Sequence, residues 1–285
     1  MEIGWLTNSS PTRLLRRFLH PKPPQSEGVR VRVTQTGPIF RLPNELFLDI
    51  LSHFPVVDYL DYYLRAQLVP LRRPKLPKVY YWWFTVLVSL TSTCWDMRLK
   101  LLPVLWGRIQ TYVEVGSLMD YESKMPQLLL LRCAILSKTP SIAVHVKVLS
   151  VSLTFHGWYM ESSLSSFVGC LYALPNLHTL EIVYCLSGRY PAGVKRAFAA
   201  VSLPNILTLT LHSRAGDVIK ACPNVKEVTL ICGGSNIPDS VVELLADMRH
   251  TIRRIAVLHG SPAGVAKLAE RFPTLGELSL RQASD

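Results

Sequence analysis

Reactive side chains occur throughout the 285-residue chain, but their spacing matches no familiar catalytic or metal-binding motif. The six cysteines form no CxxC pair, and neither an HExxH motif nor a glycine-rich phosphate loop occurs. His145 and His156 have no carboxylate or serine at a motif spacing, and the segment 260–264 lacks the spacing of a nucleophile elbow. We therefore expect a protein that is not an enzyme, with no catalytic residue, no bound metal and no cofactor.

Targeting signals are the next feature to consider. The first twenty residues lack the apolar run of a secretory signal, because Arg13, Arg16 and Arg17 interrupt it. We expect a cytoplasmic or nuclear location, where the cysteines would be buried thiols. The uncharged aromatic run Val79–Trp95 has 17 residues, short of the roughly 20 that a membrane-spanning helix needs. It predicts a buried helix and leaves a membrane-attached protein as an alternative.

Positive charge is concentrated in two segments of the chain. The formal net charge is +11, and the excess lies in residues 1–38 and in a proline-rich segment at residues 65–78. We interpret the first as a flexible tail and the second as a solvated loop, because a nucleic-acid groove would carry basic residues across a folded surface. We expect neither nucleic acid nor membrane as a partner. Nucleic-acid binding through residues 65–78 remains the alternative function.

Internal repeats occupy the second half of the chain. The pattern apolar-Pro-x-apolar-x-x-apolar-x-apolar begins at residues 174, 203, 222 and 272, and a degenerate copy covers residues 249–257. Between Pro175 and Pro273 the repeats average 24.5 residues. Each copy predicts a short strand, since its last two apolar residues share one face. An apolar strand at residues 146–151 extends the series upstream.

Helices are predicted between these strands. Apolar residues at i, i+3, i+4 and i+7 precede each copy, which indicates a helix that buries one face. These stripes begin at Leu164, Val194, Ala215, Val241 and Val265. Ser240 with Glu243 predicts a capping box, and Ser261 before Pro262 predicts an N-cap with proline at the first helical position.

The repeats resemble leucine-rich repeats. The Asn/Cys position that follows each strand in that family is matched only by Cys185. We therefore expect irregular units without the family's internal asparagine ladder. A generic α/β layer without solenoid order is the alternative.

The segment 39–109 resembles an F-box. Leu42-Pro43-Asn44-Glu45-Leu46, with Ile50-Leu51 downstream, is similar to the opening of that motif. The segments 90–95 and 101–109 look like the end of many fungal F-box modules. The chain departs from the compact family pattern by an insert at about 61–85 and by Met97, where an aromatic residue is common.

These resemblances imply an α+β or α/β solenoid architecture with four parts. An N-terminal helical F-box-like module would precede a short irregular leucine-rich-repeat solenoid. The predicted parts are a basic tail (1–38), the F-box-like module (39–110), a helical linker (111–140) and the repeat domain (141–285).

The fungal-type F-box/leucine-rich-repeat family implies a non-catalytic, substrate-recognition adaptor of a cullin-RING (SCF-type) ubiquitin ligase. The module would bind the Skp-type linker protein and its cullin complex, and the repeats would bind an unknown protein target. By resemblance, the linker-binding residues are Leu42, Pro43, Leu46, Ile50, Leu51, Cys94, Leu105 and Trp106. Because alternate strand residues point away from the core, the expected target-binding residues are Thr179, Glu181, Thr208, Thr210, Glu227, Thr229, Arg254, Glu277 and Ser279.

Overall fold

A computed structural model of the chain provides the structure. It describes residues 46, 49, 51, 78–92, 95–111, 118–153, 160–185, 190–232, 236–273 and 275–281. The predicted basic tail and residues 65–77 of the basic segment lie outside these ranges. The chain divides into two compact units: the described residues up to Leu105 belong to the first, and those from Trp106 onward to the second.

Two helices account for most of the described part of the first unit. Helix α4 (Lys78–Thr91) buries Leu87 and Val88, and helix α5 (Trp95–Gly107) buries Met97 and Leu101. Helix α4 covers most of the predicted apolar run and ends where the Thr91 hydroxyl donates to the Val88 carbonyl at 2.8 Å. Among the described residues, no helix is both long enough and apolar enough to cross a membrane.

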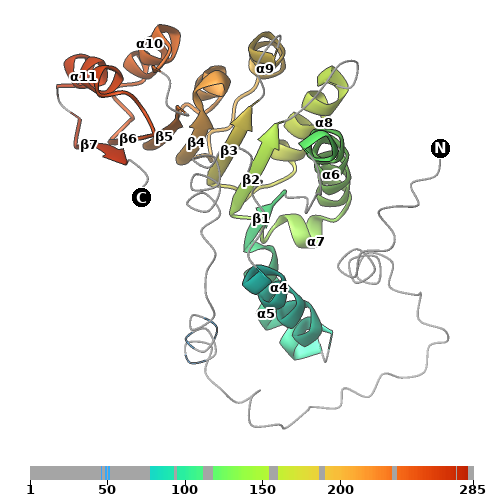
Figure 1. Cartoon of the computed structure of the whole chain (residues 1–285). Helices are drawn as coiled ribbons and strands as arrows, with labels where there is room; N and C mark the ends of the chain where they lie inside the picture. Colours follow the sequence, from blue (N-terminus) through green and yellow to red (C-terminus); the bar gives the residue numbers. More distant parts are fainter. Residues whose placement is uncertain are drawn as a thin grey trace, which may run out of the picture. The chain divides into compact units, whose positions relative to one another are not determined.

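A seven-stranded parallel sheet forms the framework of the second unit (Figure 1). Each strand pairs with the next one along the chain, so the spatial order is the sequence order. The strands are β1 (Arg108–Gln110), β2 (Val148–Leu153), β3 (Thr179–Cys185), β4 (Thr208–His212), β5 (Glu227–Ile231), β6 (Arg254–Leu258) and β7 (Glu277–Arg281).

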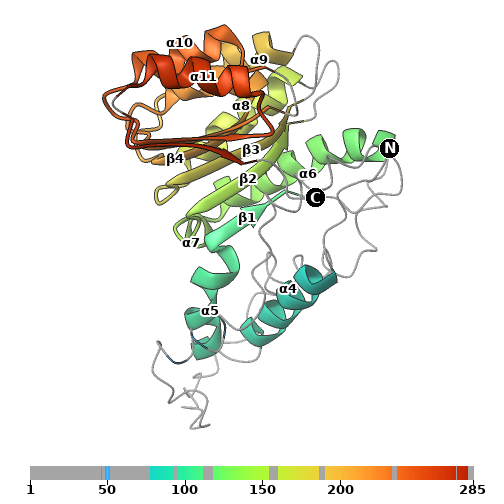
Figure 2. The same ribbon diagram turned by 60° about the vertical axis from the view of Figure 1, so that its left-hand side comes forward.

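Helices connect the strands and cover one side of the sheet, as Figures 1 and 2 show for α8 to α11. Their bounds are α6 (Leu118–Lys138), α7 (Pro140–Ala143), α8 (Met160–Tyr172), α9 (Tyr190–Phe198), the 3₁₀ helix η4 (Ser213–Ala221), α10 (Asp239–Asp247) and α11 (Pro262–Arg271). Parallel strands need such crossover connections. The structure thus confirms the predicted α/β class, and helix α6 lies in the segment expected to be helical.

Equivalent positions of the sequence repeats are paired with one another in the sheet. Leu180, Leu209, Val228 and Ile255 are paired in register across four strands, and each is at most 1% exposed. The next apolar position of each strand is equally buried. This side of the sheet and the apolar faces of the helices make up the core, which explains why the pattern recurs.

Asparagines of the Pro-Asn turns link successive repeats. The Nδ2 groups of Asn176, Asn205 and Asn224 donate to the carbonyls of Val144, Pro175 and Pro204 at 2.7, 3.2 and 3.0 Å, respectively. Each bond reaches back to the preceding turn. We expected no asparagine ladder, because the Asn/Cys position that follows each strand in leucine-rich repeats is matched only by Cys185. The structure has a different ladder, located before the strand.

One predicted α-helix is instead the 3₁₀ helix η4. Pro204 and Pro223 are only 19 residues apart, whereas Pro175 and Pro204 are 29 apart. Helix η4 is not continuous, because Ala215 has non-helical backbone angles (φ −100°, ψ 19°) and marks a kink between two short 3₁₀ pieces. The shortened repeat therefore returns to the sheet through short 3₁₀ turns instead of a regular α-helix. The apolar stripe is nevertheless buried, since Ala215, Val218 and Ile219 are 0% exposed.

The two predicted helix caps had different outcomes. Ser261 is the N-cap of α11, accepts a hydrogen bond from the Gly264 N–H at 3.1 Å, and is followed by Pro262. The capping box at Ser240 is wrong. Helix α10 begins at Asp239 with Pro238 as its N-cap, so Ser240 already lies inside the first turn.

Candidate functional site

The side of the sheet opposite the helices carries two rows of outward-pointing strand residues, which we call row one and row two. Strand register places Arg108, Val148, Thr179, Thr208, Glu227, Arg254 and Glu277 in row one. The same register places Gln110, Ser150, Glu181, Thr210, Thr229, Ala256 and Ser279 in row two. All nine predicted target-binding residues lie in these rows.

Row one ends in a charged cluster on strands β5 to β7. Arg254 lies between two carboxylates, with its Nε 2.7 Å from Glu277 and its Nη1 3.7 Å from Glu227. All three side chains are about half exposed. All three are among the expected target-binding residues, and the strand register brings them side by side. With two carboxylates and one guanidinium, the cluster carries a net negative charge accessible to a macromolecular partner.

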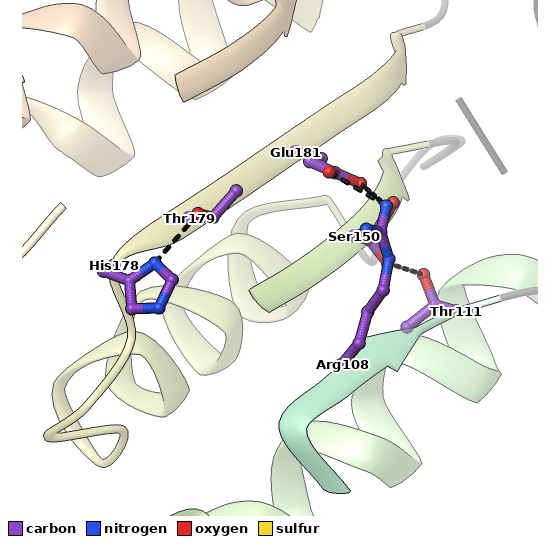
Figure 3. A network of polar contacts seen from close by, with 6 residues as sticks. All are labelled: Arg108, Thr111, Ser150, His178, Thr179 and Glu181. Carbon is purple, nitrogen blue, oxygen red and sulfur yellow. Dashed lines mark hydrogen bonds and ion pairs between the residues drawn. The ribbon is translucent and has the colours of Figure 1, made fainter. Parts of the chain in front are cut away.

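A second ion pair lies at the opposite end of the rows (Figure 3). Arg108 of β1 extends across β2, and its Nη2 is 3.0 Å from both carboxylate oxygens of Glu181 on β3. The Glu181 side chain is 8% exposed and that of Arg108 is 35% exposed. A guanidinium nitrogen that donates to both oxygens of a carboxylate makes charge-assisted hydrogen bonds, which are stronger than neutral ones.

Unsatisfied polar atoms surround this ion pair. Among the described residues, the buried Nε of Arg108, Oε1 of Gln110 and Oγ of Ser150 have no hydrogen-bond partner. Gln110 is 3% and Ser150 0% exposed. Buried polar atoms are usually paired, so these three atoms offer unused donor and acceptor capacity at one end of the rows.

Hydroxyl groups occupy the middle of the rows. Thr179 and Thr208 are neighbours in row one, and Thr210 and Thr229 are neighbours in row two. The Thr179 hydroxyl lies 3.0 Å from Nδ1 of His178 (Figure 3). Hydroxyls both donate and accept, so this part of the surface suits varied polar groups.

Two of the nine predicted residues are less accessible than we expected. Glu181 is 6% and Thr210 4% exposed, although both point away from the core. Five members of the rows were missed: Arg108, Gln110, Val148, Ser150 and Ala256. Strand β1 has only three residues and no Pro-Asn turn ahead of it, so its only sequence signal is the alternation across Arg108-Ile109-Gln110.

The predicted linker-binding residues are only partly described. Leu42, Pro43, Ile50 and Cys94 lie outside the described residues. Leu46 is 52% exposed, whereas Leu51 is buried. Leu105 and Trp106 are 6% and 7% exposed, at the end of helix α5. Exposure thus distinguishes Leu46, which is available for contact, from three residues that are packed.

The described cysteines and the pocket provide no chemical centre. Cys133, Cys170, Cys222 and Cys232 are buried thiols, as expected, and none of these four forms a disulfide. Burial raises the pKa of Cys222 to about 12 and that of Cys232 to about 11, which keeps both protonated. No group of His, Cys, Asp and Glu among the described residues could hold a metal. A pocket of about 80 Å³ beside Pro175 and Pro204 is below the roughly 300 Å³ of typical ligand sites.

No protein-family model matches the chain, and no curated protein matches it significantly.

Proposed function

We propose that the chain is a substrate-recognition adaptor of a cullin-RING ubiquitin ligase. In this proposal the first unit is an F-box-like module that binds a Skp-type linker protein, and the second is an irregular leucine-rich-repeat solenoid that binds a protein target. The adaptor would accelerate ubiquitin transfer by holding a target lysine close to the charged carrier.

One observation carries the proposal: row one, whose members are all at least partly exposed, runs across seven neighbouring strands beside the largely buried row two. With strands about 4.8 Å apart, the rows extend about 29 Å, the scale of a protein contact rather than of a small ligand. The rows mix both charge signs with hydroxyls, and their ion pairs lie at opposite ends. Such a surface favours a folded protein or a long peptide over a uniformly charged phosphate backbone.

The first unit supports the linker contact through Leu46. A leucine that is 52% exposed leaves apolar surface available to a partner, at a position where the F-box resemblance expects contact. Leu51 and Leu105 are buried and would support the module from inside, whereas the buried Trp106 belongs to the second unit.

Co-purification with the Skp-type linker tests the proposal. Leu46→Asp should abolish stoichiometric capture while circular dichroism shows an intact fold. Leu99→Asp is the matched control, since Leu99 is also 52% exposed and belongs to the same unit; it should retain capture. Failure of well-folded wild-type protein to bind the linker would remove the ubiquitin part of the proposal.

Target binding is tested separately on the rows. Thr208→Arg with Thr229→Arg adds two bulky charges at the centre of the surface and should eliminate target crosslinks without affecting linker capture. Lys220→Glu on η4, an exposed residue of the helical layer, should leave both unchanged. Equal loss of crosslinks in the two variants would contradict recognition by the rows.

A further inference from the structure

Strand β7 leaves part of the sheet's apolar core uncovered. Leu211, Leu230 and Val257 occupy equivalent positions in β4, β5 and β6 and are 0% exposed, whereas Leu280 in β7 is 37% exposed. No described strand pairs with the other side of β7 (Figure 1). Since an exposed apolar edge strand readily pairs with another chain, this edge is suited to receive a further strand.

The backbone of β7 has a defined hydrogen-bonding direction at this edge. The Glu277 N–H donates to the Arg253 carbonyl at 3.2 Å, which points residue 277 toward β6. In a parallel ladder, residues alternate in the strand they bond to. Residues 279 and 281 therefore also bond toward β6, and the N–H and carbonyl groups of Leu278 and Leu280 face outward.

The sequence of β7 is complementary to itself when reversed. It reads Glu-Leu-Ser-Leu-Arg over residues 277–281. In an antiparallel pair centred on Ser279, each Glu277 stands opposite an Arg281, and each Leu278 opposite a Leu280. Opposite charges at directly facing positions stabilise such a pair. We propose that two copies of this chain associate through antiparallel pairing of their β7 strands.

The outward-facing groups fit this register. The two facing Leu278–Leu280 pairs would be the hydrogen-bonded pairs, each exchanging two backbone bonds, and Ser279 would be a non-hydrogen-bonded pair. Glu277 already contacts Arg254, and a carboxylate has enough lone pairs to accept a second cation. The two-fold axis keeps both helical layers on the same side, so rows one and two of the two copies join into one surface. Each copy contributes only five residues to this interface. Because the interface is small, we expect a dissociation constant of about 10–100 µM.

Sedimentation of the full chain over a concentration series, with charge reversals, tests the proposal. Wild type should dimerise, whereas Glu277→Arg and Arg281→Glu should each be monomeric, because every facing pair then carries like charges. The doubly reversed variant should dimerise again. A mixture of the two single variants should give a heterodimer, since their strands are complementary to each other but not to themselves.

The matched control is Glu227→Arg, which also removes a carboxylate beside Arg254 but lies on β5, away from the edge. It should dimerise like the wild type. A wild-type chain that remains monomeric up to about 1 mM, the range of the weakest contacts, overturns the proposal. A dimer that survives both single reversals, or a doubly reversed variant that stays monomeric, also overturns it. None of these outcomes depends on the Skp-type linker, so they are independent of the proposed function.

Discussion

At the scale of single residues, two ion pairs on one surface differ mainly in their contact with water. In the Arg108–Glu181 pair one guanidinium nitrogen contacts both oxygens of a carboxylate side chain that is 8% exposed, whereas in the Arg254–Glu277 pair both side chains are about half exposed. Water screens the second pair more strongly, and exposed pairs contribute little to stability. Removing one partner of the first pair would leave the other charge less accessible to water than the charge left by the same change in the second pair.

Double-mutant cycles should reveal this difference. The cycle from Arg108→Met and Glu181→Gln should give a coupling free energy of about 1–2 kcal/mol. The cycle from Arg254→Met and Glu277→Gln should give at most about 0.5 kcal/mol. Denaturant unfolding of the four variants of each cycle measures both values. Equal coupling free energies would show that burial does not make the first ion pair stronger than the second.

His212 gives the folded state a dependence on pH. Burial, and secondarily the charge of Arg214, lowers the pKa of His212 from 6.5 to about 4. As the pH falls, the unfolded chain therefore binds this proton before the folded chain does. The free energy of unfolding should decrease between pH 6.5 and 4, by about 1–3 kcal/mol for this group.

The variant His212→Asn isolates that contribution. His212 is the N-cap of η4 and accepts a hydrogen bond from the Arg214 N–H at 3.3 Å. Asparagine can also accept this bond but does not titrate. Unfolding experiments from pH 7 to 4 should show a shallower loss of stability in the variant. Identical slopes would contradict the assignment.

At the scale of elements, close backbone approach requires glycine at two places. A Cβ on Gly216 of η4 would lie 2.5 Å from Cγ2 of Val241, a buried residue of α10. A Cβ on Gly260, just after β6, would collide with Cγ1 of Val257. The first position lets the short 3₁₀ repeat pack against its neighbour, and the second lets the chain turn tightly from strand to helix.

Alanine at Gly260 should therefore destabilise the protein by about 1–3 kcal/mol, the usual cost of an overpacked core. Gly169 is the control, because it lies inside α8 with no atom within 4 Å of an added Cβ. Gly169→Ala should stabilise by about 0.5–1 kcal/mol, since alanine favours helix. Thermal unfolding of both variants shows whether each substitution raises or lowers the stability of the protein. A destabilised Gly169→Ala would refute the steric explanation.

The elements also show how far sequence reasoning extends. The prolines at 175, 204, 223 and 273 predicted strands at the correct positions, because a fixed turn before each strand sets its register. The tighter η4 was not predicted, since Ala215, Val218 and Ile219 are buried under either helical period. Strand β1 has no such turn, so the ion pair that joins Arg108 to Glu181, 73 residues away, could not be predicted.

At the scale of the whole second unit, every described strand pairs only with its neighbours in the sequence. Stability in such an arrangement is roughly the sum of each repeat and its two interfaces. Strands β4 and β5 have neighbours on both sides and fully buried leucines, whereas β7 has one described neighbour and an exposed Leu280. The sheet should therefore lose structure first at β7.

Amide hydrogen exchange tests this order. In the charge-reversed variant Arg281→Glu, which we expect to be monomeric, amides of β7 should exchange about 10–100-fold faster than those of β4 and β5. Each tenfold difference corresponds to about 1.4 kcal/mol of local opening free energy. Uniform protection from β2 to β7 would indicate a single cooperative unit and contradict the nearest-neighbour account.

The nearest-neighbour order of the strands also determines how the sheet responds to mechanical force. A tether attached at residues 108 and 281 would pull on the two outermost strands of the sheet. The load would fall on one ladder of hydrogen bonds at a time, so the sheet would open by peeling rather than by shearing all strands together. Extension should proceed as a series of small force peaks, each releasing one strand with its helix.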